Sequence, residues 1–101
     1  MHAASFISIG NYEGFAGLNP ISIKLNGRSF TSTDGYFCTF DTTSSSPSIS
    51  TMVNATVLSE SALLCSVSWQ YPAAIVVVGL KARVGLVSRP SRPQYFNFKG
   101  Q

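Results

Sequence analysis

Apolar and polar residues alternate with a period of two along most of the chain, a pattern that predicts β-strands. In the segment ISIKL (residues 21–25), three aliphatic side chains share one face while a serine and a lysine share the other. The Asn26-Gly27 pair that follows predicts a turn, because both residues tolerate positive φ. Nowhere does an apolar stripe recur at helical spacing for more than one turn, so the chain is expected to be all-β.

The same alternation places both cysteines on apolar faces. In YFCTF (36–40), Cys38 shares its face with Tyr36 and Phe40. In LLCSVSW (63–69), Cys65 shares its face with two aliphatic side chains and with Trp69, the only tryptophan. We therefore expect Cys38 and Cys65 to point inward.

Three further segments carry strand signals. In MVNATV (52–57), Val53, Ala55 and Val57 face one way, whereas Asn54 and Thr56 face the other. From Ile75 to Val87, alternate apolar residues as far as Val84 and Leu86 keep one parity, which predicts one long strand or two strands that bend near Gly79 or Gly85. The segment YFNF (95–98) predicts a last short strand.

The connections between these strands are also readable. TTSSSPSIST (42–51) is polar and of low complexity, which predicts a mobile loop, and SES (59–61) predicts a turn. Tyr71-Pro72 is expected to end the strand before it. SRPSRPQ (88–94) contains two prolines, cannot pair as a central strand, and is expected to loop.

Short strands and frequent turns over 101 residues predict one domain, an antiparallel β-sandwich of about seven strands. Residues 1–101 would form that single domain, with 1–5 and 99–101 as flexible or linker segments. The first residues lack the basic start and the long apolar core of a signal peptide. The longest apolar run, AAIVVVGL, is far shorter than the roughly 20 residues that cross a bilayer. No direct membrane insertion is expected.

Composition narrows the function classes. Charged residues make up only 11% of the chain, well under the roughly 25% of an average soluble protein, which is common among secreted β proteins. The seven Lys and Arg residues are spread along the chain, so we expect no nucleic-acid partner.

Catalysis and cofactor binding find no support in the residues. His2 is the only histidine, too few for a metal site or a catalytic triad, and it falls at the chain terminus. The four acids, Glu13, Asp34, Asp41 and Glu60, are scattered and read as solvated surface. The chain is expected not to be an enzyme and to need no cofactor or metal.

Two inward cysteines leave three interpretations open, of which a reactive or metal-binding role has the least support. A bond between Cys38 and Cys65 would close a loop of 27 residues and constrain the unfolded chain by roughly 3.5 kcal/mol. Alternatively, both are separate buried thiols that behave as small apolar side chains, as in reducing compartments. In addition, Asn54-Ala55-Thr56 is a sequon whose asparagine has outward parity, which predicts an N-linked glycan at Asn54.

Taken in order, these landmarks resemble the IPT/TIG domain, the immunoglobulin-like module of plexins and of many large surface proteins. SFISIGNYEGFAGLNPISIKLNGRSF resembles the family's first segment, with turn glycines at Gly14 and Gly17 and a G-x-x-F ending at Gly27 and Phe30. YFCTF, VNATVLSESALLCSV, IVVVGL and YFNF are similar to its later strands. The chain departs from the pattern at Gly17-Leu18, where the family has a doubled glycine, and at Pro72, which comes later than the usual proline.

The resemblance implies an immunoglobulin-like fold with an intradomain disulfide between Cys38 and Cys65. It implies a non-catalytic extracellular or cell-surface module whose partners are neighbouring domains of the same parent chain or another surface protein. One alternative is a TIG domain of a transcription factor, which would contact the DNA backbone or dimerise, with Arg89 and Arg92 as the candidates for its cationic face. The second is a carbohydrate-binding accessory module with an aromatic platform, for which the candidates are Trp69, Tyr71, Tyr12 and Phe15.

Overall fold

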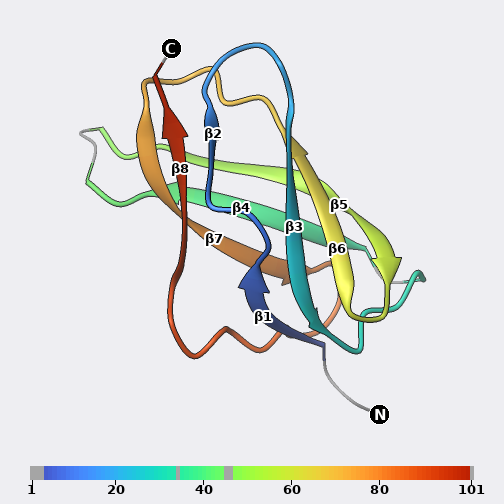
Figure 1. The fold of residues 1–101 in the computed structure, drawn as a ribbon. Helices are drawn as coiled ribbons and strands as arrows, with labels where there is room; N and C mark the ends of the chain where they lie inside the picture. The colour runs from blue at the N-terminus through green and yellow to red at the C-terminus, as the bar shows by residue number, and fades with distance from the viewer. Residues whose placement is uncertain (1–3, 34, 45–46, 101) are drawn as a thin grey trace.

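The computed structural model describes residues 4–33, 35–44 and 47–100, and every regular element in those ranges is a β-strand (Figure 1). The strands are β1 (Ser5–Ile9), β2 (Glu13–Phe15), β3 (Ile21–Arg28), β4 (Tyr36–Thr42), β5 (Ser50–Ser59), β6 (Ala62–Val67), β7 (Ala74–Ala82) and β8 (Gln94–Lys99). The all-β prediction is confirmed, with eight strands in the described residues where about seven were expected.

The strands follow the order β1-β3-β6-β5-β4-β7-β8-β2 in a sheet that curls into two layers. Strand β5 makes the corner, because its first half pairs with β4 and its second half, from Ala55 on, pairs with β6. In Figure 1, β3 and β6 cross in front of β4 at a steep angle. Most pairs are antiparallel, but the three-residue β2 runs parallel to β8. The predicted sandwich is therefore built from one folded-over sheet.

The core lies between the two layers, and the period-two pattern determines which side chains enter it. Along β4, Tyr36, Cys38 and Phe40 are buried while the residues between them are only partly buried. Strand β8 repeats the pattern with Phe96 and Phe98. The largest fully buried side chains come from both layers and from the segment after β6: Trp69, Phe6, Phe40, Phe96, Phe98, Ile9, Ile23, Leu25, Leu63 and Val76.

The turn predicted at Asn26-Gly27 is wrong, because β3 continues to Arg28 and pairs with β1 through both residues. A Cβ at Gly27 would overlap the carbonyl oxygen of Ser5 and the ring of Phe30. Glycine here allows strand β1 and an aromatic ring to approach closely. Strand β3 ends at Arg28, and the next residue, Ser29, adopts a positive φ of 63°.

The long strand predicted from Ile75 to Val87 is also shorter than expected. Strand β7 ends at Ala82, and the side chains of Val84 and Leu86 are 79% and 87% exposed instead of buried. Gly79 makes no bend, because the register between β4 and β7 is continuous across it. Gly79 faces Thr39, whose Oγ1 occupies the space that a Cβ would need.

Most connections between strands lie where the sequence predicted them. The turn at SES is confirmed between β5 and β6. The polar stretch 42–51 contributes Thr42 to β4 and its last two residues to β5, and positions 45 and 46 lie outside the described residues. Residues 89–93 contain no strand. At the chain ends, Ser5 belongs to β1 and Lys99 to β8, while residues 1–3 and 101 lie outside the described ranges.

Candidate functional site

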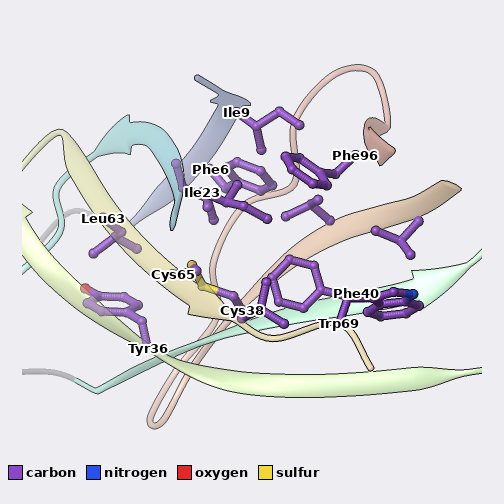
Figure 2. Packing of buried hydrophobic residues seen from close by; sticks show 14 of the residues in the cluster. Phe6, Ile9, Ile23, Tyr36, Cys38, Phe40, Leu63, Cys65, Trp69 and Phe96 are labelled. Carbon is purple, nitrogen blue, oxygen red and sulfur yellow. A yellow bond between two sulfur atoms is a disulfide. The ribbon is translucent and has the colours of Figure 1, made fainter. Parts of the chain in front are cut away.

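Cys38 and Cys65 form a disulfide in the middle of the core (Figure 2). Their Cα atoms are 6.3 Å apart, and both side chains are fully buried. Cys38 lies on β4 opposite Val53 and Leu80, whereas Cys65 lies on β6 opposite Ile23. Because β4 and β6 belong to different layers, the bond ties the two layers together. The reading as two free thiols is thereby replaced by the disulfide.

Trp69 is a core residue and not part of a binding platform. Its side chain has no exposed surface, and its indole stacks on Phe98 with ring centroids 4.4 Å apart and planes 3° apart. The indole N–H donates to the carbonyl oxygen of Pro72 at 3.0 Å, so the one polar atom of the side chain is satisfied. Tyr71 packs edge-on against the indole and remains 44% exposed.

The other aromatic candidates do not join Trp69 and Tyr71 in one platform. Tyr12 and Phe15 are 63% and 56% exposed, and neither lines the shallow hollow of about 270 Å³ beside Tyr71. The ammonium of Lys99 lies 5.2 Å from the centre of the Phe15 ring and 3.3 Å from the carboxylate of Glu13. An aromatic sugar-binding platform would therefore lack Trp69, its largest candidate ring, because that ring is buried.

Asn54 lies on the outer face of β5, as its parity predicted. Its side chain and that of Thr56 are both exposed, while Val53 and Ala55 face the core. Across the ladder, Asn54 stands opposite Phe37 of β4. Both residues that a glycosyltransferase must reach are therefore on an open surface.

The acids that the structure describes lie apart from one another. Glu13 pairs with Lys99 on β2 and β8, Asp41 accepts a hydrogen bond from Ser50, and Glu60 lies in the turn between β5 and β6. Within residues 4–33, 35–44 and 47–100, no group of three His, Cys, Asp or Glu side chains is placed to hold a metal ion. His2 and Asp34 lie outside the described residues.

The cations are spread along the chain, as expected, but four of them belong to one part of it. Lys81, Arg83, Arg89 and Arg92 are all exposed and all belong to the end of β7 or the loop that follows it. These four of the seven cations fall within twelve positions of sequence, so spacing alone could have revealed the cluster. We call them the cationic cluster.

These features define a class: a disulfide-linked, two-layered β domain of immunoglobulin-like architecture. No protein-family model and no curated protein matches the chain. Among solved structures, the chain is similar to the full extracellular region of plexin A4, with a TM-score of 0.66 and 15% sequence identity. The match covers 95% of this chain and 10% of the plexin chain, so this chain spans about a tenth of that receptor region. At this identity the likeness shows the fold.

In the part of the chain that the structure describes, no helix has the length and apolarity needed to cross a membrane.

Proposed function

We propose that this chain is a non-catalytic extracellular module of a larger cell-surface, adhesive, receptor or filament protein. The observation that carries the proposal is the buried Cys38–Cys65 bond between the two layers. Structural disulfides form and persist in oxidising compartments and are rare where glutathione and thioredoxin keep thiols reduced. A fold with this bond at its centre is suited to the cell surface or the extracellular space.

The structural likeness supports the modular part of the proposal. The fold of this chain recurs within an extracellular receptor region about ten times its length. In Figure 1, β1 begins at one end of the molecule and β8 ends at the other. A domain that receives the chain at one end and releases it at the other can space its neighbours in a series. Its partners would be those neighbouring domains or another surface protein.

Within the immunoglobulin-like class, we assign the chain to the IPT/TIG type. The residues that carry this resemblance occupy defined positions: Gly27 packs under Phe30, and the cysteines of YFCTF and LLCSV face each other from β4 and β6. The aromatic segment YFNF forms β8 and delivers two rings to the core. Their order along the chain supports the assignment.

The location is tested on the parent protein in its own cells. An antibody raised against the folded domain should stain intact, unpermeabilised cells or detect the protein in the medium. Surface biotinylation provides the second readout, with a cytosolic protein as the negative control. Staining that appears only after permeabilisation, together with absence from the medium, would refute the extracellular proposal.

We also propose that Asn54 carries an N-linked glycan in its native context. When the chain is directed through a eukaryotic secretory pathway, its mass should fall after treatment with a glycan-removing amidase. Asn54→Gln should abolish that change while leaving the Cys38–Cys65 bond and the melting temperature intact, because Asn54 is exposed. Secretion of folded protein without any sugar at Asn54 would contradict the assignment.

A further inference from the structure

Strand β7 has an open backbone edge along its last four residues. Strand β8 pairs with β7 only from Ala74 to Val78, whereas β4 pairs with β7 as far as Ala82. Residues Gly79–Ala82 therefore have a strand partner on one side and no described strand on the other. Unpaired strand edges are sites where another chain can add to a sheet.

The direction of the backbone groups follows from contacts at both ends of β7. The carbonyl oxygen of Ile75 accepts from Thr43, and the N–H of Arg83 donates to Gly35, so these odd-numbered positions face β4. Backbone direction alternates along a strand, which turns the N–H and C=O groups of Leu80 and Ala82 toward the open edge. Among the backbone hydrogen bonds described outside the strand ladders, none reaches Leu80 or Ala82.

A groove of about 670 Å³ lies along this edge, between β7 and residues 85–94. The opposite wall is held away from β7 by backbone hydrogen bonds to the start of the chain. The N–H of Ser88 donates to the carbonyl oxygen of Ala4, and the carbonyl oxygen of Ser88 accepts from the N–H of Phe6 in β1. Pro90 and Pro93 in that wall lack an N–H and cannot complete a ladder with β7. The chain's own loop thus leaves the edge available.

The lining of the groove selects an occupant. Its inner side is apolar, with Leu80, Ala82 and Val87, which suits aliphatic side chains that point toward the core. Its outer rim carries Lys81 and Arg89, two members of the cationic cluster, against one acid, Asp41, which is already bonded to Ser50. Successive side chains of a strand point to opposite faces, so an alternating apolar and acidic segment matches both sides.

We propose that the open edge of β7 at Gly79–Ala82 binds an extended peptide with alternating aliphatic and acidic side chains, by adding it as a strand. At about 3.3 Å per residue the edge offers roughly 13 Å, enough for about four residues of the partner. The inference rests on the proposed role as a binding module, but the groove is independent of the compartment. Intracellular staining would defeat the proposed function without affecting the peptide measurement.

The test uses the synthetic peptide Thr-Val-Glu-Val-Glu-Val-Thr, blocked at both ends, titrated into the isotope-labelled, oxidised domain. We expect the amide signals of Leu80 and Ala82 to shift on binding and to gain protection from hydrogen exchange. Two control peptides separate the contributions. One carries lysine in place of glutamate, and the other is methylated on its three central backbone nitrogens. Each control peptide should bind more weakly by a factor of about ten or greater. The lysine peptide lacks the matching charge, and the methylated peptide lacks the backbone donors of the ladder.

Variants locate the site. Lys81→Glu combined with Arg89→Glu should weaken the acidic peptide by about tenfold and favour the lysine peptide. The matched control Lys24→Glu, exposed on β3, should change neither affinity. Ala82→Pro removes one edge N–H and should abolish the protection of Leu80, with thermal unfolding confirming that the fold is retained.

Four outcomes would overturn the proposal. One is no shift at millimolar peptide, and another is equal binding of the methylated peptide. The third is concentration-dependent shifts of Leu80 and Ala82 without peptide, which would assign the edge to a second copy of the chain. The fourth is protection of these amides by phosphatidylserine vesicles but not by the acidic peptide, which would assign the cationic cluster to a membrane surface.

Discussion

Gly27 lies where two other parts of the chain converge. The carbonyl oxygen of Ser5 and the ring of Phe30 occupy the space beside its Cα, and Phe30 in turn packs edge-on against Tyr36 at 5.5 Å. The hydroxyl of Tyr36 accepts from the N–H of Thr31, which anchors the return of the chain into β4. One missing side chain therefore permits a packed corner next to β1.

Replacing Gly27 by alanine should destabilise the domain by about 1–3 kcal/mol, because the new methyl group forces the backbone or the ring to move. Urea unfolding of the oxidised protein measures the loss. Gly100→Ala is the matched control, since the nearest atom to its added Cβ is Ala73 Cβ at an ordinary 3.8 Å. Equal stability of both variants would show that the close approach at Gly27 is not required.

Trp69 is a second residue whose contribution to the stability of the core can be measured. Trp69→Ala should cost about 3–5 kcal/mol, because it removes the largest buried side chain and its stack on Phe98. Trp69→Phe should cost less, about 1–2 kcal/mol, since it keeps a ring but leaves the Pro72 carbonyl without its donor. A loss below about 1 kcal/mol for the alanine variant, measured by urea unfolding, would contradict a core role.

Individual residues show what alternation can and cannot predict. It placed Cys38, Cys65 and Trp69 inside because each shares its parity with other apolar residues along the chain. The turn rule for Asn-Gly failed at Gly27, where the local turn preference loses to close contacts with Ser5 and Phe30. Such a contact depends on which strands become neighbours, which the local sequence does not contain.

Among the elements, β7 ends at Ala82 although the alternation of apolar residues continues beyond it. Val78 and Val84 have the same parity, yet Val78 is 2% exposed and Val84 is 79% exposed. The difference arises because β4 begins at Tyr36, opposite Ala82, so no residue of β4 pairs with the chain beyond Ala82. The sequence still alternates at Val84 and Leu86, but these residues form no strand.

A matched pair of substitutions measures this boundary. Val78→Ala should lower the free energy of unfolding by about 2 kcal/mol, because it empties space in the core. Val84→Ala should change it by no more than about 0.5 kcal/mol. Chemical denaturation with the disulfide intact checks both, and a comparable loss at Val84 would mean that the strand continues past Ala82.

Strand pairing was the least predictable feature of the elements. β2 is only three residues long and runs parallel to β8, so its alternation is too brief to recognise. β5 reads as an ordinary amphipathic strand, although it changes partners midway from β4 to β6. The open edge of β7 likewise depends on where β8 stops and on how β1 holds Ser88, both of which are tertiary facts.

At the scale of the whole molecule, the disulfide acts across a sheet that already connects its two layers through β5. The double variant Cys38→Ala/Cys65→Ala should lose roughly 3.5 kcal/mol, because the unfolded chain regains the freedom of a 27-residue loop. Typical domains have about 5–15 kcal/mol in total, so the variant should fold but melt at a lower temperature. An unchanged melting temperature would show that the bond is dispensable.

The architecture and the buried pair could thus be read from alternation and from the ordered resemblance. The candidate sites were less accessible, because Trp69 is rejected as a platform only once its stack on Phe98 is known. The four cations are close together in the sequence, but which of them line the groove depends on how residues 85–94 pass along β7. Function at a surface depends on what the fold leaves uncovered.

The central claim is that a disulfide joins the two layers through the core and that the protein resides in an oxidising compartment. The most direct test is the redox state of Cys38 and Cys65 in the native protein. Protein from its own cells is denatured in an alkylating reagent without reductant, digested, and weighed by mass spectrometry. We expect one linked pair of peptides carrying Cys38 and Cys65 and no alkylated cysteine. Two alkylated thiols in freshly isolated, folded protein would contradict the central claim.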